Sequence, residues 1–192
     1  KKICPYLDIP FQHISDHQLS LMKRRHTKAD AYALIERLRA AVPDLALRTT
    51  LLVGYPEETE ADFEELMEFV EKVRFERLGV FPSSEAEGTF SARELQDNVP
   101  EEVKQERVDR IMALQNRISL EKNQARVGQR EQVIVDSRQG DWYVARGRYD
   151  SPEVDQEILI PASERQLRRG VIYTVEITGA EEYDLYASVV GK

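Results

Sequence analysis

Side chains that could bind a metal gather near the start of the sequence, at Cys4, His13 and His17. His13 and His17 have the spacing that puts two imidazoles on one face of a helix, and a thiol could add a further ligand. However, Pro10 and the strand-like residues before His13 argue against one continuous helix there. We therefore interpret these residues as unrelated rather than as a metal site.

Polar residues also follow the first strand-like segment: Asp8, Gln12 and His13 lie near its end, and Ser15 and Asp16 come next. In barrel enzymes the carboxyl ends of parallel strands face the active site, so these side chains are candidates for a binding site. The alternative is a capped turn, in which Ser15 or Asp16 is the N-cap of the following helix. Residue types and spacing favour neither interpretation.

A third candidate is the turn at Gly54, between a strand that ends at Val53 and a helix that begins near Thr59. A glycine turn lets the backbone approach a ligand closely, and a helix start offers free amides. A plain strand-to-helix connection with a cap explains the same pattern more simply. No Walker A pattern is present, so the sequence does not support a P-loop nucleotidase.

The composition limits the classes of partner that the chain could bind. The chain has 192 residues, of which 41% are hydrophobic and 32% charged, as in globular proteins. Its 35 acidic and 27 basic residues give a net charge of -8, which argues against binding along a phosphate backbone and favours a basic partner. Neither a signal peptide nor a membrane-spanning run is recognisable, which predicts a cytoplasmic protein without membrane contact.

Cysteine is nearly absent, since Cys4 is the single one in the chain. One thiol excludes an internal disulfide framework. It also excludes any metal or iron–sulfur site built from cysteines of this chain alone.

The apolar pattern divides the chain near residue 127 and predicts an α/β part followed by an all-β part. The expected strands of the first part are 5–13, 45–53 and 78–81, and its expected helices are 16–25, 27–41, 59–70 and 101–126. Thr27-Lys28-Ala29-Asp30 and Thr59-Glu60-Ala61-Asp62 have the form of capping boxes at two helix starts. Strands and helices in this order form a parallel sheet through right-handed crossovers, here part of a larger barrel or wound sheet.

After residue 127 the sequence predicts a small barrel. The expected strands are 132–136, 142–146, 156–160, 171–177 and 184–190, separated by short turns. We therefore expect two domains, 1–126 and 127–192. Each carries a net charge of -4, so neither is basic.

An acidic loop interrupts this barrel, with Asp150, Glu153 and Asp155 close together. It is either a solvated turn or a recognition loop for a cationic partner. Arg146 and Arg148 lie beside aromatic residues, a combination that can stack on nucleic-acid bases. The neighbouring carboxylates weaken that interpretation.

Together these segments resemble the radical SAM methylthiotransferases, over nearly the whole chain. Residues 6–16 resemble the family's PYxDxPxQHxSD strand, 22–27 its MxRxxT, 48–59 its RTxxIVGFPGET, 78–89 its LGVFxYSxEEGT, 147–155 its GRxxDxPEVD, and 183–186 its closing YDLY. Three departures stand out. Glu57 replaces a glycine of GFPGET, Pro82 precedes Ser83 where the family often has tyrosine, and the CxxxCxxC motif is missing.

The resemblance implies a fold and cofactors. It identifies the first part as the C-terminal part of an open, TIM-like radical SAM barrel, and the second as a five-stranded, OB-like TRAM domain. The complete enzyme would use S-adenosyl-L-methionine (SAM) and two 4Fe–4S clusters. One cluster would reduce SAM to a 5′-deoxyadenosyl radical, and the other would supply sulfur. Since this chain lacks the cluster cysteines, we expect it to hold neither cluster and to be inactive alone.

The resemblance also implies site residues and a substrate. Gln12, His13, Arg24, Thr50, Gly54 and Phe81 are the expected SAM-pocket residues. Arg24 would pair with the SAM carboxylate and Phe81 would pack on the adenine. Asp150, Glu153 and Asp155 of the TRAM domain would grip the substrate.

The expected reaction adds a methylthio group to the β-carbon of an aspartate in small-subunit ribosomal protein S twelve, a basic protein. Two alternatives remain. One is a methylthiotransferase of the same family that acts on tRNA, and the other is a non-catalytic module that binds a partner.

Overall fold

The computed structural model describes residues 3–84, 93–152 and 154–191. They form two compact units. One comprises Leu7–Gln115, and the other comprises Asn116–Lys192 with the N-terminal residues through Tyr6. The division falls within the long helix α5 (Glu101–Gln124). Among the described residues, no helix combines the length and the apolar character needed to cross a membrane.

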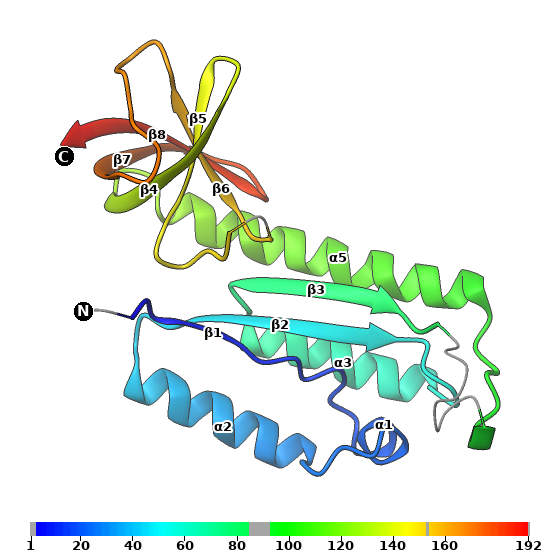
Figure 1. Ribbon diagram of the computed structural model, residues 1–192. Helices are drawn as coiled ribbons and strands as arrows, with labels where there is room; N and C mark the ends of the chain where they lie inside the picture. Colours follow the sequence, from blue (N-terminus) through cyan, green and yellow to red (C-terminus); the bar gives the residue numbers. More distant parts are fainter. Residues whose placement is uncertain (1–2, 85–92, 153, 192) are drawn as a thin grey trace. The chain divides into compact units, whose positions relative to one another are not determined.

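The first unit is built on a three-stranded parallel sheet in the order β1 (Tyr6–Asp8), β2 (Ala46–Val53) and β3 (Arg77–Pro82) (Figure 1). The β2–β3 register runs from Arg48 opposite Arg77 to Val53 opposite Pro82. The parallel sheet expected from the sequence is confirmed.

Three helices accompany this sheet: α1 (Asp16–Leu21), α2 (Lys28–Ala41) and α3 (Glu60–Val73). Both predicted capping boxes are confirmed. The backbone N–H of Thr27 donates to Asp30 Oδ2 at 2.9 Å, and that of Asp30 donates back to Thr27 Oγ1 at 3.2 Å. Thr59 and Asp62 repeat the same pair of bonds at the start of α3. These bonds satisfy amides that the first turn leaves without a partner.

An aromatic cluster forms the centre of this unit's core. The rings of Phe69 and Phe75 lie 5.4 Å apart, and Phe11 packs edge-on against Phe69 at 5.6 Å. All three side chains are almost completely buried. Edge-to-face pairs of this kind stabilise beyond their buried area, so this cluster fixes the segment after β1 against α3.

Two elements are shorter than the sequence predicts. The strand expected over 5–13 ends at Asp8, because Pro10 cannot donate to the ladder and Gln12 adopts a left-handed φ of 68°. Gln12 keeps only an isolated bridge to Leu51. The helix expected over 16–25 ends at Leu21, where Lys23 turns the chain with a φ of 57°.

The second unit contains a closed five-stranded barrel, as expected (Figure 1). Its strands are β4 (Arg130–Gln139), β5 (Trp142–Arg146), β6 (Glu157–Pro161), β7 (Ile172–Ala180) and β8 (Asp184–Gly191). They close in the order β4-β5-β6-β8-β7, with β6 and β8 parallel and the other pairs antiparallel. β4 is longer than expected because a register shift between Val135 and Ser137 carries the strand past Asp136.

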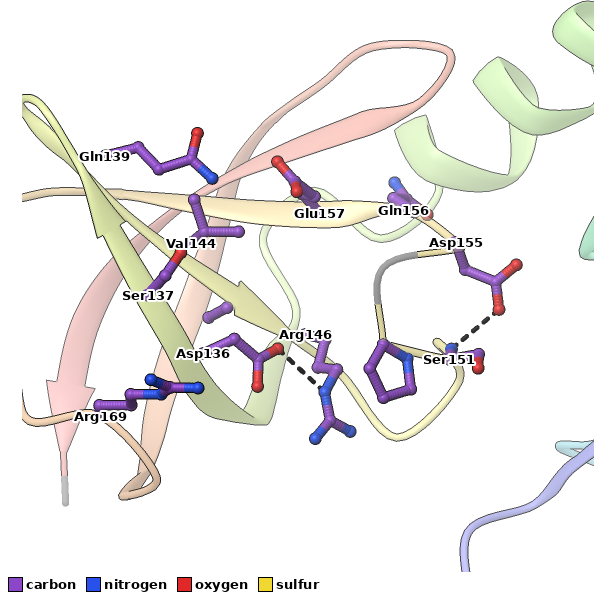
Figure 2. Close-up of a pocket in the computed structure, with 12 residues that line it drawn as sticks. Asp136, Ser137, Gln139, Val144, Arg146, Ser151, Asp155, Gln156, Glu157 and Arg169 are labelled. Atoms are coloured by element: carbon purple, nitrogen blue, oxygen red, sulfur yellow. Dashed lines mark hydrogen bonds and ion pairs between the residues drawn. The ribbon is translucent and has the colours of Figure 1, made fainter.

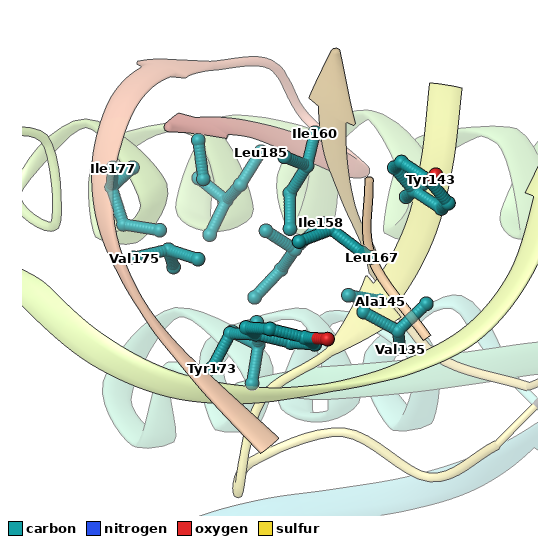
Figure 3. Packing of buried hydrophobic residues seen from close by; sticks show 12 residues of the cluster. Val135, Tyr143, Ala145, Ile158, Ile160, Leu167, Tyr173, Val175, Ile177 and Leu185 are labelled. Atoms are coloured by element: carbon teal, nitrogen blue, oxygen red, sulfur yellow. The ribbon is translucent and has the colours of Figure 1, made fainter. Parts of the chain in front are cut away.

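Alternate residues of these strands fill the barrel. Tyr143 and Ala145 of β5, Ile158 and Ile160 of β6 and Leu185 of β8 point into one shared cluster (Figure 3). Because the side-chain period of a strand is two, the residues between them lie on the outer face.

Candidate functional site

The sheet of the first unit has one buried face and one partly open face. Along β2, buried residues alternate with half-buried ones, and Thr50 and Leu52 belong to the half-buried set. The parallel register puts Gly79 beside Thr50 and Phe81 beside Leu52. Phe81 is 56% exposed, which is unusual for so large an apolar side chain in a strand. We call Thr50, Leu52, Gly79 and Phe81 the open sheet face.

Gly79 has a packing role on this face. A Cβ there would lie 3.4 Å from the ring of Phe81 and 3.9 Å from Arg48 Nη2. The aromatic ring therefore lies beside bare backbone. Arg48 in turn donates to Asp8 Oδ2 at 2.7 Å. The face thus offers an apolar ring, a hydroxyl and an ion pair side by side.

A hydrogen-bonded cluster around Asp62 lies where β1 and β2 lead into their helices. Asp62 Oδ2 accepts from Thr59 Oγ1 at 2.6 Å and lies 3.0 Å from His17 Nδ1, while Asp62 Oδ1 accepts from Ser15 Oγ. Burial alone would raise the pKa of Asp62, but the bonds from Ser15, Thr59 and His17 hold this pKa well below its usual range. The cluster ties α1 to α3. Ser15 is also the N-cap of α1, so the capped-turn interpretation is correct for this residue.

Helix α5 contributes a buried cation to the same region. Arg107 Nη1 lies 3.0 Å from Glu58 Oε1; the side chain of Glu58 has no exposed area, and that of Arg107 is 6% exposed. Glu58 Oε2 accepts from the backbone amides of Gly54 and, at 3.3 Å, of Tyr55. The pair therefore fixes the turn that follows β2.

Burial shifts two titrating groups here in opposite directions. It raises the pKa of Glu58 to about 7, although Arg107 opposes the shift. It lowers the pKa of His13 to about 4, because the buried imidazole has few groups to stabilise its charge. As pH rises from about 4.5 towards 7, Glu58 lowers the free energy of unfolding. His13 raises it between about 4 and 6.5, so the two effects largely cancel.

Lys104 of α5 covers the turn itself. Gly54 has a φ of 69°, and a Cβ there would lie 2.2 Å from Lys104 Cγ. The Lys104 side chain is 1% exposed, and its Nζ lies 2.7 Å from both Asp97 and Glu101. Gly54 is therefore required for two reasons, its backbone conformation and the lysine stem against it.

Glu57, where the methylthiotransferases have glycine, keeps a glycine-like backbone. Its φ is 66°, and its N–H donates to Asn98 Oδ1 at 2.9 Å. A left-handed φ costs a residue with a Cβ about 1 kcal/mol. The turn thus retains its shape despite the substitution.

The predicted SAM-pocket residues lie in three places. Thr50 and Phe81 share the open sheet face; Gln12 adjoins it, because its N–H donates to Thr50 O at 2.9 Å. Gly54 and His13 lie at the strand ends, where His13 is fully buried and its Nδ1 accepts from the Ser15 amide. Arg24 lies elsewhere, exposed in the turn after α1. Their roles in binding SAM remain predictions.

The predicted substrate residues belong to the barrel unit. Asp150 is buried, and its Oδ2 accepts from the Gly147 amide at 3.3 Å; Asp155 accepts from the Ser151 amide at 2.8 Å. Both carboxylates thus organise their own loop. Glu153 lies outside the described residues, as do Glu85, Gly88 and Thr89 of the family pattern.

A cavity of about 390 Å³ lies beside that loop (Figure 2). Asp155 lines it from the loop, Val144 and Glu157 line it from β5 and β6, and Arg146 pairs there with Asp136 at 2.9 Å. It contains both signs of charge. The residues considered for stacking on nucleic-acid bases contact each other instead. The guanidinium carbon of Arg148 lies 4.7 Å from the centre of the Tyr149 ring, so this arginine–tyrosine pair already exists within the chain.

Lys104, Arg107 and Arg110 were not singled out from the sequence, although they organise the strand ends. A signal was present: they recur every third residue on α5, while Glu58 lies just before α3, and Glu60 and Glu64 lie in its first turns. Arg110 pairs with Glu60 at 2.9 Å and also with Glu64. Complementary stripes of this kind indicate two helices in contact.

The two cofactors that the resemblance implies differ in how well these residues suit them. The open sheet face suits an adenosyl group, since an exposed ring and a nearby hydroxyl can pack on and orient a purine. An iron–sulfur cluster does not fit: Cys4 is exposed, and the described residues contain no group of three or more His, Cys, Asp or Glu able to hold a metal ion.

Comparison with known proteins matches two parts of the chain to known families. Residues 1–70 match the radical SAM superfamily and residues 127–190 match the TRAM domain. The chain is 53% identical over 188 residues to the ribosomal protein uS12 methylthiotransferase RimO of Phocaeicola vulgatus, and 52% identical over 190 residues to that of Bacteroides thetaiotaomicron. These matches cover 98% and 99% of this chain but 44% of each relative. The chain thus spans less than half the length of these relatives.

A solved structure is also similar. Coproporphyrinogen III oxidase (HemN) from Escherichia coli, described as a radical SAM enzyme, matches 60% of this chain and 27% of its own with a TM-score of 0.51. The identity is 19%, so this likeness concerns the fold alone.

Proposed function

This chain belongs to the radical SAM methylthiotransferase family, and we propose that it acts within an enzyme that adds a methylthio group to the β-carbon of an aspartate in ribosomal protein uS12. The observation that carries this proposal is the identity of 52–53%, over nearly the whole chain, to relatives named for that reaction. The net charge of -8 supports a basic protein substrate over tRNA. Because the proposed substrate is a ribosomal protein, the enzyme would also be cytoplasmic.

SAM, when bound, would supply radical chemistry and a methyl group. The residues of this chain would bind and orient it: Phe81 would pack on the adenine, and the hydroxyl of Thr50 and the backbone at Gln12 would offer polar atoms beside it. We assign the clusters of the complete enzyme to residues outside this chain, because Cys4 is its one thiol.

The strand ends would keep this face in shape. Glu58, held by Arg107, keeps the amides of Gly54 and Tyr55 engaged, so the turn at the edge of the face stays closed. The barrel would hold the protein substrate. Asp150 and Asp155 contribute by ordering the acidic loop, and Glu153 stays a predicted substrate residue.

Phe81→Ala tests the open sheet face. We expect this variant to bind SAM roughly tenfold more weakly, because an aromatic ring that packs on a ligand over its whole face contributes about 1–2 kcal/mol to the free energy of binding. Equilibrium dialysis of labelled SAM against the chain measures this directly, without turnover. Ile172→Ala, which truncates a 53% exposed side chain of the barrel, is the matched control and should leave SAM binding unchanged. Equal binding by the two variants would remove Phe81 from the proposed pocket.

A further inference from the structure

The outer surface of the barrel carries an aromatic pair on strands β5 and β8. The rings of Trp142 and Tyr186 lie 5.6 Å apart at 63°, an edge-to-face contact. Trp142 is 37% exposed, and a Cβ added at Gly179 would lie 3.4 Å from the ring of Tyr186. Neither residue belongs to the buried cluster that fills the barrel.

The strand register makes this pair part of a continuous surface. Val144 pairs with Leu159, and Leu159 pairs with Tyr186, so the three form one row across β5, β6 and β8. Trp142 lies opposite Pro161 in the next row. The neighbours of these residues along each strand point inward (Figure 3), so both rows lie outside the barrel.

Carboxylates border this surface. Glu157 and Asp184 lie opposite each other in the row beside Leu159 and Tyr186, and Glu181 Oε1 accepts from Tyr186 Oη at 3.3 Å. The Glu181 carboxylate raises the pKa of Tyr186, and burial followed by Glu181 raises that of Asp184. The shift of Tyr186, whose main cause is the Glu181 carboxylate, has the sign expected where the local potential is negative. Two arginines line the neighbouring cavity, Arg146, which pairs with Asp136 at 2.9 Å, and Arg169.

The cavity beside the acidic loop is continuous with this surface, because Val144 and Glu157 line both (Figure 2). A volume of about 390 Å³ is within the range of small-ligand pockets. An aromatic pair bordered by carboxylates, next to a pocket, suits a long cationic side chain. Its stem can pack on the rings while its charge meets the acids.

We propose that the outer face of β5, β6 and β8 docks an arginine- or lysine-rich segment of a basic protein, with Trp142 and Tyr186 receiving a cationic side chain. This rests on the function proposed above, which supplies such a partner in uS12. An RNA strand could stack on the same rings, but its phosphates would meet Glu157, Asp184 and Glu181. Charge complementarity therefore favours the protein.

Trp142 makes the test specific, since it is the one tryptophan in the chain. The chain is titrated with purified uS12, and separately with tRNA, while tryptophan emission is followed after subtraction of each probe's own signal. We expect a saturable change with uS12 that weakens as salt is raised, and none with tRNA.

A charge variant and a matched control locate the surface. Glu157→Gln with Glu181→Gln removes two exposed carboxylates from its border and should weaken uS12 binding roughly tenfold. Glu68→Gln with Glu71→Gln removes the same charge from exposed positions on α3 and should change binding less than about twofold. Circular dichroism checks that both variants are folded.

The outcomes separate this proposal from the function on which it rests. If uS12 binds but Trp142 emission is unchanged and the two double variants behave alike, the docking face is wrong and the function stands. If tRNA gives the saturable change and uS12 does not, both are overturned. If neither probe binds the chain, the docking face is overturned, and modification of uS12 by a complete enzyme still tests the function.

Discussion

Arg107→Met will lower the free energy of unfolding of the first unit by about 3–5 kcal/mol, the usual cost of leaving one member of a buried ion pair without its partner. Glu58 has no exposed side-chain area, so water cannot replace the guanidinium. Its pKa, already raised to about 7, will rise further without Arg107. Since the folded state then favours protonated Glu58, the deficit should be larger at pH 8 than at pH 5.

Urea unfolding followed by circular dichroism measures this loss, because α2, α3 and most of α5 belong to the first unit. Arg110→Met is the matched control. Arg110 lies on the same helix and, like Arg107, stacks on Phe63, but its side chain is 36% exposed. Exposed pairs contribute about 1 kcal/mol or less. Equal losses in the two variants would show that the Glu58–Arg107 pair is not the buried anchor described above.

Gly54→Ala should destabilise the first unit by about 2–4 kcal/mol, the combined cost of a left-handed backbone and an overpacked contact. The added methyl would lie 2.2 Å from Lys104 Cγ, and Lys104 cannot easily swing away because Asp97 and Glu101 hold its Nζ. Thermal or urea unfolding measures the effect.

Two further variants separate the causes of that loss. Gly140→Ala has a similar φ, 59°, with nothing within 4 Å of the added methyl, so it should cost only about 1 kcal/mol. Lys104→Ala removes the clashing stem, and in combination with Gly54→Ala it should be less harmful than the sum of the two single changes. Strictly additive losses would contradict a steric contact between Gly54 and Lys104.

Local rules predicted much of the fold. The capping boxes at Thr27 and Thr59 are short-range patterns, and both are confirmed because their bonds join residues three apart. The closed barrel followed from regularly spaced strands. Errors fell where one residue interrupts a pattern: the left-handed Gln12 ends the first strand early, and the register shift near Asp136 lets β4 continue.

The sequence predicted less of the candidate site than of the fold. Phe81 and Thr50 share a face only because two strands pair in a particular register, and Arg107 meets Glu58 across 49 positions of the chain. The first contact depends on the pairing register of β2 and β3, and the second on how helix α5 packs. The charge pattern on α5 and α3 indicates that the two helices meet, but not which side chains pair. The resemblance supplied the candidate residues, and the structure shows which of them adjoin one another.

The central claim is that this chain serves an enzyme that modifies uS12. It is tested most directly by joining the chain to the remaining part of the Bacteroides thetaiotaomicron relative, with which it shares 52% identity. The purified chimera is reconstituted with iron and sulfide, supplied with SAM and a reductant, and given uS12 and tRNA together. Mass spectrometry should then find one methylthio group on an aspartate of uS12 and none on tRNA. A chimera that consumes SAM yet leaves uS12 unmodified, or that modifies tRNA instead, would contradict the account.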